Sequence, residues 1–419
     1  MRRNLAMGAA GLAVGLLALT GCSSSADVSS GSASGGGTTT LTYLSWETQD
    51  VMQPVLKAFE AAHPEIKIEA SYAPPVQGYI TTLQARLLAG TAPDVFMMAA
   101  ENKTGLIDGK FVLDLAGEGF MSNIPKFNQT TYGRDGSVYG MSIASWGAGL
   151  MYNVDMLASV GYDAPPENWD DFIAMCLKLD AAGISPFLEA IDGMPIILGA
   201  QLGAYNASIG GTMDDKIFDG TSSFDEQWTP IVKEYNKLYE SGAVTRDVVG
   251  LSRADAQNAF YAGKTAMTIG RPWIMAAAHE AGGPDLKFKV VKVPAIAGFE
   301  PYVAGAASPA FAINSSSDKV EAAKTFLTWM SSPAGAESFA TNTGQITVTS
   351  DFKPTLDPAL DPILSDIRAG NLYLPQIAWQ RSEDVLNQEA IAQIQRMVTG
   401  EITPQEFTKA LDSRLASAS

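Results

Sequence analysis

The sequence predicts an α/β fold built as two lobes, and two observations carry that prediction. From Leu41 onward, short β-rich runs alternate with segments whose apolar residues recur at helical spacing, which is typical of sheets covered by helices. The alternation falls into two blocks, and no repeat of fixed period links them. With 419 residues, the chain is long enough for two or three domain-sized units.

The first block has the order strand, helix, strand, helix, strand. The expected strands are residues 41–46, 66–69 and 94–98, and the expected helices are residues 51–59 and 79–88. This order predicts parallel strands, and in such sheets the loops at the carboxyl ends of the strands form the ligand crevice. It places Trp46 and Glu47 after the first strand, and Glu101 and Asn102 after the third.

The second block begins near Met141 and continues the alternation. An extended run leads to a helix between Pro166 and Gly183, and a later helix, turn and strand end in Arg271-Pro272-Trp273. A strand, a Ser/Asp turn and an amphipathic helix follow over residues 311–332, and two helices close the chain. We therefore expect a second α/β lobe.

The amino-terminal segment predicts a secreted lipoprotein. Two arginines precede an apolar run, residues 5–19, and Leu19-Thr20-Gly21-Cys22 resembles the bacterial lipobox. The run is shorter than the about 20 residues of a membrane span. We expect a signal peptide over residues 1–21, a lipidated Cys22, and a flexible linker rich in Ser, Gly and Thr over residues 22–38. The protein would be anchored to the outer face of the cell membrane, with an ordinary cleaved signal peptide as the alternative.

The chain is acidic and has only two cysteines. Its formal net charge is −17, and removal of Arg2 and Arg3 with the signal peptide gives −17 − 2 = −19. Such a surface argues against a nucleic-acid partner, whose phosphates are bound by Lys and Arg. Cys176 lies on an apolar helix face, so we expect a buried, inert thiol and no disulfide.

The residue types argue against an enzyme. His63 and His279 are the only histidines, and neither a GxSxG motif nor a His/Cys zinc cluster is present. Gly263-Lys264-Thr265 does not complete a phosphate loop, because Asn258 stands where the first glycine is needed. With 45 acidic residues, the sequence alone does not exclude a glycosidase-type pair of carboxylates. We expect no catalytic residue, no metal and no cofactor.

Six segments in a fixed order carry a resemblance to a known family. They are TAPDVFMMAAEN (91–102), YGMSIASWGAGLMYNVDML (139–157), PPENWDDFIAMCLKLDAAGISPF (165–187), AFYAGKTAMTIGRPW (259–273), SSDKVEAAKTFLTWMSS (316–332) and TGQITV (343–348). In these segments the chain resembles the family 1 extracellular solute-binding proteins of bacterial ABC importers, in the sugar-binding group that includes maltose-binding protein. The likeness covers residues 39–415.

The resemblance implies a two-lobed fold of the periplasmic-binding-protein type, in which each lobe is a mainly parallel sheet flanked by helices. It implies about three crossings between the lobes, which we place near Ile143–Ser145, Val293–Ala297 and Gly344–Val348. One lobe would then combine residues 39–143 with 298–343, and the other would combine residues 146–292 with 349–415.

The resemblance also implies how the protein works. The lobes would close on a ligand in the cleft by hinge motion, and the closed protein, expected to be a monomer, would dock on the transmembrane permease subunits of an ABC transporter. The implied ligand is a carbohydrate, either a monosaccharide or an oligosaccharide.

Sugar recognition needs flat aromatic faces for the C–H face of a pyranose and planar polar groups for its hydroxyls. The candidate ligand-binding residues are Trp46, Glu47, Glu101, Asn102, Trp146, Arg271, Trp273, Gly305 and Trp379. Trp169, Trp228 and Trp329 are better explained by packing, because they lie at helix starts or on helix faces.

Two departures from the family pattern leave the ligand open. Maltose-binding protein has an Asp-Arg pair at the positions of Glu101 and Asn102, and an aromatic residue at the position of Met98, so maltose itself is in doubt. There are two alternatives to a neutral sugar. The first is a cationic solute such as a polyamine, which would be bound by Glu47, Glu101 and the tryptophans. The second is a phosphorylated solute such as glycerol phosphate, or an acidic sugar, which would be bound through Arg271.

Overall fold

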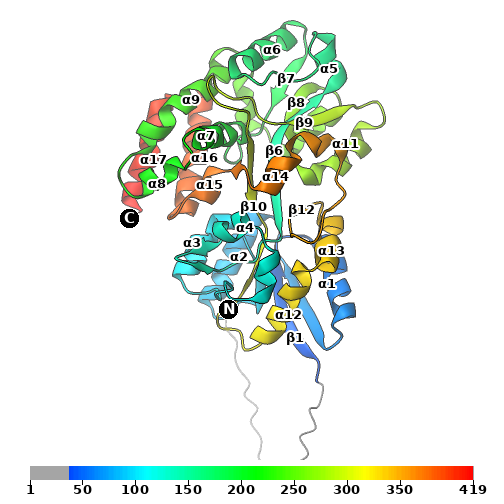
Figure 1. Ribbon diagram of the computed structural model, residues 1–419. Coiled ribbons are helices and arrows are strands. Elements are labelled where there is room, and N and C mark those ends of the chain that lie inside the picture. Colours follow the sequence, from blue (N-terminus) through cyan, green and yellow to red (C-terminus); the bar gives the residue numbers. More distant parts are fainter. Residues whose placement is uncertain (1–36, 419) are drawn as a thin grey trace, which may run out of the picture. The chain divides into compact units, whose positions relative to one another are not determined.

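The computed structural model describes residues 37–418, and residues from Thr38 onward form one compact unit. The predicted signal peptide and the predicted lipidation site, Cys22, lie outside the described residues. The unit has two lobes, each with its own sheet (Figure 1). No helix in the described part of the chain is long and apolar enough to cross a membrane.

The first lobe contains the βαβαβ unit that the sequence predicts. Its sheet has the order β11-β3-β1-β2, in which β1 is parallel to both β2 and β3 and β11 is antiparallel to β3. The strands are β1 (Thr39–Ser45), β2 (Ile66–Tyr72), β3 (Val95–Met98) and β11 (Ala310–Ile313). The helices are α1 (Gln49–Ala62), α2 (Val76–Leu88), α3 (Lys103–Asp108), α4 (Lys126–Thr131), α12 (Val320–Ser331) and α13 (Pro333–Thr343), and a short hairpin pairs β4 (Gly133–Arg134) with β5 (Ser137–Val138).

The second lobe is built on the long strand β6 (Ala144–Asn153). Its sheet has the order β13-β10-β6-β8-β7, and β9 and β12 also pair with β6. The other strands are β7 (Ser185–Leu188), β8 (Thr265–Gly270), β9 (Phe288–Val291), β10 (Val303–Ala307), β12 (Ile346–Thr347) and β13 (Leu372–Tyr373).

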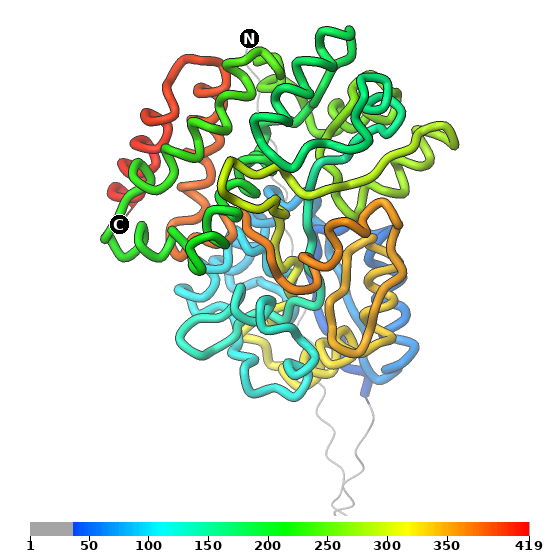
Figure 2. The backbone as a smooth tube through the Cα atoms, turned by 45° about the horizontal axis from the view of Figure 1, so that its top comes forward, coloured from blue at the N-terminus to red at the C-terminus, as the bar shows by residue number. Residues whose placement is uncertain are grey.

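Eleven helices of the second lobe surround this sheet in the described part of the chain. They are α5 (Val154–Ser159), α6 (Trp169–Ala181), α7 (Ile196–Ser208), α8 (Met213–Phe218), α9 (Phe224–Glu240), α10 (Arg253–Tyr261), α11 (Met275–Gly282), α14 (Asp361–Ala369), α15 (Pro375–Ala378), α16 (Glu383–Thr399) and α17 (Pro404–Ser417). Helices α16 and α17 pack together beside α9, although about 150 residues separate them in sequence (Figures 1 and 2).

The expectation of a mainly parallel sheet is wrong for the second lobe. Strand β6 is antiparallel to β8, β9, β10 and β12, and only β7–β8 and β10–β13 are parallel pairs. The physical reason is that β6 enters directly from the first lobe and its neighbours arrive by other routes. None of them is therefore joined to it by the strand–helix–strand crossover that enforces parallel pairing.

The predicted position of the second crossing between the lobes, Val293–Ala297, is also wrong. Strand β10 pairs with β6 of the second lobe, with Gly305 opposite Gly147, and the next strand, β11, pairs with β3 of the first lobe. The chain therefore crosses at Ser308–Pro309, and residues 298–307 do not belong to the first lobe. The segment Val-Ala-Gly-Ala-Ala has few of the β-branched and aromatic residues that are typical of strands, so its sequence does not predict β10.

Local sequence signals explain several helix ends. Asn168 caps α6 by accepting hydrogen bonds from the N–H groups of Asp170 and Asp171. Thr403 and Glu406 form a reciprocal capping box at the start of α17. Cys176 is fully buried on α6, and burial raises the pKa of its thiol, as expected for an inert core residue.

Candidate ligand-binding site

A cavity of about 340 Å³ lies between the lobes and brings five of the predicted site residues together. Its wall is formed by Trp46, Glu47, Val76, Ala99, Glu101, Trp146, Trp273, Ser308, Pro309, Thr343 and Gln345. We call it the tryptophan cavity. The first lobe, the second lobe and two of the crossing segments all contribute to it, so a molecule bound there would contact every part that moves in a hinge closure.

The aromatic wall comes from three tryptophans, one on a strand and two just after the ends of other strands. Trp146 lies on β6 and Trp273 follows β8 in the short 3₁₀ turn η4 (Pro272–Ile274), and their rings meet edge to face at 5.6 Å and 73°. Trp46 follows β1 and meets Tyr79 edge to face at 5.2 Å. Trp273 is 40% exposed, unlike the tryptophans that pack in the core. An exposed aromatic face beside a cavity is suited to covering an apolar ligand face.

Two carboxylates face this aromatic wall. Glu47 follows β1, where its N–H donates to Ser45 Oγ at 2.9 Å, and Glu101 lies on the 3₁₀ turn η1 (Ala100–Asn102) after β3. Burial raises the pKa of both carboxyl groups. In the described part of the chain neither forms an ion pair, and no Lys, Arg or His lines the tryptophan cavity.

Gln345 is a site residue that the sequence reasoning missed. It lies on the third crossing, directly after Gly344, whose left-handed backbone (φ 68°) ends α13. Its Oε1 is buried, and among the described residues no donor satisfies it. The segment TGQITV carried the signal of a crossing, but nothing in it indicated which side chain turns toward the cavity.

Asn102 and Arg271 do not line the tryptophan cavity. Asn102 is 5% exposed, and its side-chain amide has no partner among the described residues. Arg271 is 8% exposed and lies in a separate small cavity with Glu189 and Arg253, where burial lowers its pKa to about 10. The expectation that Arg271 donates to a ligand is therefore corrected, because the chain enters the 3₁₀ turn η4 directly after Arg271, so Arg271 and Trp273 no longer share one face of a strand.

Trp379 and Gly305 have structural roles in this arrangement. Trp379 is fully buried, with its ring stacked on Trp228 at 6.2 Å and 27° and edge-on to Phe224 at 6.1 Å. A Cβ on Gly305 would lie 2.1 Å from the carbonyl oxygen of Trp146, so this position requires glycine for the close approach of β10 to β6. The sequence prediction of a ligand contact at Trp379 is corrected to core packing.

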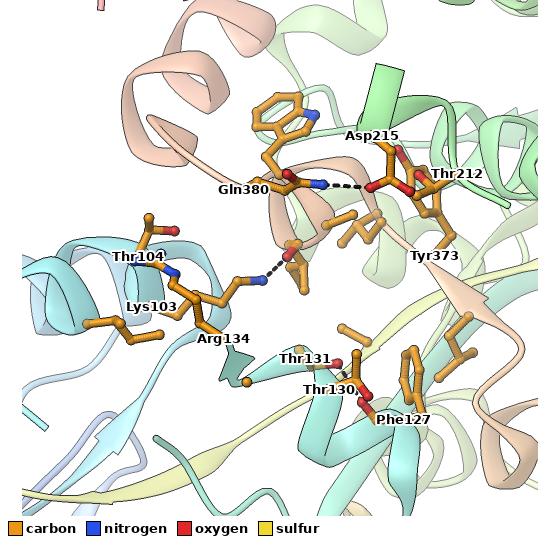
Figure 3. Close-up of a pocket in the computed structure, with 18 of the residues that line it drawn as sticks. Lys103, Thr104, Phe127, Thr130, Thr131, Arg134, Thr212, Asp215, Tyr373 and Gln380 are labelled. Atoms are coloured by element: carbon orange, nitrogen blue, oxygen red, sulfur yellow. Dashed lines mark hydrogen bonds between the residues drawn. The ribbon is translucent and has the colours of Figure 1, made fainter. Parts of the chain in front are cut away.

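A second, larger cavity of about 650 Å³ also lies between the lobes (Figure 3). We call it the far cavity. It is lined from the first lobe by α3, α4 and the hairpin, and from the second lobe by residues of α8, β10, β13 and α15. Several of its polar groups are paired: Lys103 Nζ donates to the Ile377 carbonyl, and Gln380 Nε2 donates to Asp215 Oδ1 at 2.7 Å (Figure 3). Thr104 Oγ1 and Trp379 Nε1, which also line it, have no partner among the described residues. Arg134 forms an ion pair with the carboxylate of Asp108.

The comparison with known proteins identifies the family. The family profile described as bacterial extracellular solute-binding protein matches residues 45–337, and the chain belongs to this family. Its members are extracytoplasmic binding proteins, not enzymes.

Several known proteins are similar to this chain. A family 1 extracellular solute-binding protein from Bifidobacterium longum subsp. infantis has a TM-score of 0.80 and 30% identity, covering 91% of this chain and 100% of that chain. The melibiose/raffinose/stachyose-binding protein MelE of Bacillus subtilis (strain 168) is 26% identical over 94% of this chain and 92% of its own length. A putative binding protein of Brucella abortus (strain 2308) is 28% identical over 61% of this chain, and the match spans 62% of that relative's length.

Proposed function

We propose that the protein is the lipid-anchored substrate-binding component of an ABC importer, and that it captures a carbohydrate in the tryptophan cavity by lobe closure. One observation carries the proposal: tryptophans from both lobes face acceptor groups that have no ion-pair partner in the described chain. The aromatic faces would cover the C–H face of a sugar ring, and Glu47, Glu101 and Gln345 would accept hydrogen bonds from its hydroxyls.

The charge of the cavity supports a ligand that carries no negative charge. Glu47 and Glu101 contribute carboxylates, and no cationic side chain of the described residues lines the same wall. A phosphate or a uronic acid would meet like charge there without a counter-ion. The alternative of a phosphorylated or acidic solute loses its proposed binding residue, because Arg271 lies elsewhere.

A cationic solute such as a polyamine remains the second candidate. Three tryptophans and two carboxylates around one cavity also have the composition of an aromatic cage for an ammonium group. We favour the carbohydrate because MelE, which is similar over most of the chain, is named for melibiose, raffinose and stachyose.

The anchor and the permease complete the proposal. A lipid on Cys22, followed by the Ser/Gly/Thr-rich linker, would hold the folded unit at the outer face of the membrane, within reach of the permease. Cys22→Ala is expected to move the protein from the membrane fraction to the soluble fraction. Retention of this variant in washed membranes would contradict the anchor.

A thermal-shift screen of the soluble chain from Thr38 tests the ligand class. The panel would contain melibiose, raffinose, stachyose, glucuronic acid, spermidine and glycerol phosphate. A ligand that binds only the folded state at one hundred times its Kd stabilises it by about 2.7 kcal/mol. We expect stabilisation by a neutral sugar. Stabilisation by spermidine alone would favour the aromatic cage, and stabilisation by glycerol phosphate or glucuronic acid would contradict the charge argument.

A further inference from the structure

The start of α3, directly after the turn that carries Glu101, is hydrogen-bonded to the second lobe. Turn η1 runs directly into α3, and no side chain at the start of α3 caps that helix. Instead, the N–H of Thr104 donates to Glu383 Oε1 at 2.8 Å, across 279 residues of sequence. The preceding residue, Lys103, donates from Nζ to the carbonyl oxygen of Ile377 on α15 (Figure 3).

These two hydrogen bonds join the lobes, and the bond to Glu383 is buried while the bond from Lys103 is partly buried. Glu383 is the first residue of α16 and is only 3% exposed, and it forms no ion pair within the described chain. Ser382, directly before it, has φ 55°, a left-handed conformation that non-glycine residues rarely adopt. A residue is held in such a conformation only when the surrounding contacts determine it. The start of α16 is therefore fixed in a position that presents Glu383 to α3.

Opening the cleft would break both bonds. A carboxylate that accepts a hydrogen bond from a backbone N–H forms a stronger bond than a neutral acceptor does, and the strength increases where water is excluded. When the lobes separate, water takes the place of each partner. The bonds therefore stabilise the closed arrangement and contribute nothing to the open one, which is the property needed to shift a two-state equilibrium.

Charge connects this contact to the tryptophan cavity. Lys103 interacts electrostatically with both Glu383 and Glu101. Burial lowers the pKa of its amine to about 8, although the two carboxylates act in the opposite direction and raise it. Glu101 lies on the cavity wall, two residues before Lys103. A ligand that contacts Glu101 thus contacts the turn that leads directly into the start of α3, where Glu383 is bound.

We propose that Glu383 is a positioning residue that clasps the Glu101 turn to the second lobe and so sets the fraction of closed protein. The Lys103–Ile377 hydrogen bond is the second half of this clasp. The clasp acts on the lobes with or without a ligand. Its consequence for affinity rests on the proposed function, because the apparent Kd rises as the fraction of binding-competent protein falls.

Distances between the lobes in the ligand-free protein test the clasp. Spin labels at Thr81→Cys in the first lobe and Ser208→Cys in the second lobe would report lobe separation, since both positions are exposed and Cys176 is buried. Glu383→Ala is expected to shift the distance distribution toward longer values. Glu383→Gln keeps a neutral acceptor and is expected to give a smaller shift.

Asp384→Ala is the matched control, because Asp384 is the exposed acidic neighbour on the same turn of α16. It is expected to leave the distances unchanged. If Glu383→Ala and Glu383→Gln both keep the wild-type distribution while folded by circular dichroism, the clasp is wrong. Should Glu383→Ala not fold, Lys103→Met tests the other half and is expected to lengthen the distances.

A kinetic arm with raffinose as the probe separates this inference from the proposed function. In the Glu383→Ala variant, raffinose is expected to dissociate at least fivefold faster, while Glu383→Gln restores most of the slow release. A merely structural role for Glu383 would lower the melting temperature without this rescue. If wild-type protein binds no sugar, the proposed function fails, and the ligand-free distances still decide on the clasp.

Discussion

The two cavities between the lobes differ in a way that size does not reveal. The far cavity is the larger, at about 650 Å³ against about 340 Å³ for the tryptophan cavity. In the far cavity, several polar side chains are paired, as Gln380 and Asp215 are, although Thr104 Oγ1 and Trp379 Nε1 on its wall have no partner among the described residues. In the tryptophan cavity, the buried Oε1 of Gln345 also has no partner in the described chain, and Trp273 is exposed.

This difference indicates which cavity is built for a ligand. Unpaired polar atoms line both cavities, so exposed aromatic surface and charge decide between them. The tryptophan cavity has an exposed tryptophan and two carboxylates without an ion-pair partner in the described chain, which is the composition of a binding site. In the far cavity, the hydrogen bond from Lys103 to the Ile377 carbonyl joins the two lobes.

The largest effect is expected at Trp379, which borders the far cavity but packs in the core. Trp379→Ala removes the stacking on Trp228 and leaves a void, which costs about 3–5 kcal/mol for a buried aromatic residue. Urea unfolding of the ligand-free protein measures this loss. If the variant keeps the stability of the wild-type protein but loses affinity for the sugar, Trp379 contacts the ligand, and the assignment of Trp379 to the core is wrong.

A smaller but specific effect is expected at Trp273. Trp273 is 40% exposed, so Trp273→Ala is expected to weaken ligand binding at least tenfold, about 1.4 kcal/mol, with little change in the melting temperature without ligand. Isothermal titration calorimetry with the ligand from the thermal-shift screen gives the affinity. A melting temperature that falls as far as in Trp379→Ala would make Trp273 a core residue.

Stability is expected to fall as the pH rises from about 4 to 7. Burial raises the pKa of Asp214, which lies behind the far cavity, to about 6, and the pKa of Glu189 to about 7. In this window the folded state binds more protons than the unfolded state, so the free energy of unfolding decreases with increasing pH. Urea unfolding at pH 4.5 and 7 measures the slope.

Asp214→Asn separates the contribution of Asp214 from that of Glu189. Asp214 accepts a hydrogen bond from Tyr373 Oη at 2.7 Å, and asparagine keeps an acceptor there without titrating. The variant is expected to have a shallower slope between pH 4 and 6. An unchanged slope would mean that Asp214 is not a buried titrating acid.

The smallest effect is expected in the far cavity. Thr131 lines this cavity, and its hydroxyl donates to the Phe127 carbonyl at 3.0 Å within α4. Thr131→Val is expected to leave the ligand affinity within about twofold of the wild-type value, as usual for a change away from the ligand. A tenfold loss in the same calorimetric assay would show that the far cavity also contacts the ligand.

Much of the first lobe could be predicted from the sequence because its rules are local. Apolar periodicity indicates the βαβαβ order, and parallel strands bring their carboxyl ends to one edge, which unites Trp46, Glu47 and Glu101. The family resemblance added Trp146 and Trp273 from the second lobe.

The remaining errors depend on contacts between distant segments. Strand β10 could not be recognised, because its small residues form a strand only by packing closely on β6. Arg271 and Trp273 are two residues apart, yet they line different cavities, and spacing alone does not give the direction of either side chain after the strand ends. Gln345 could be found only from its unsatisfied amide oxygen.

The crystal structure of the protein with the sugar that stabilises it most would test the central claim most directly. Our account predicts electron density for a sugar ring against Trp273 and Trp146, with its hydroxyls within hydrogen-bond distance of Glu47, Glu101 and Gln345. Density beside Arg134 and Gln380 in the far cavity, with the tryptophan cavity holding only water, would contradict it.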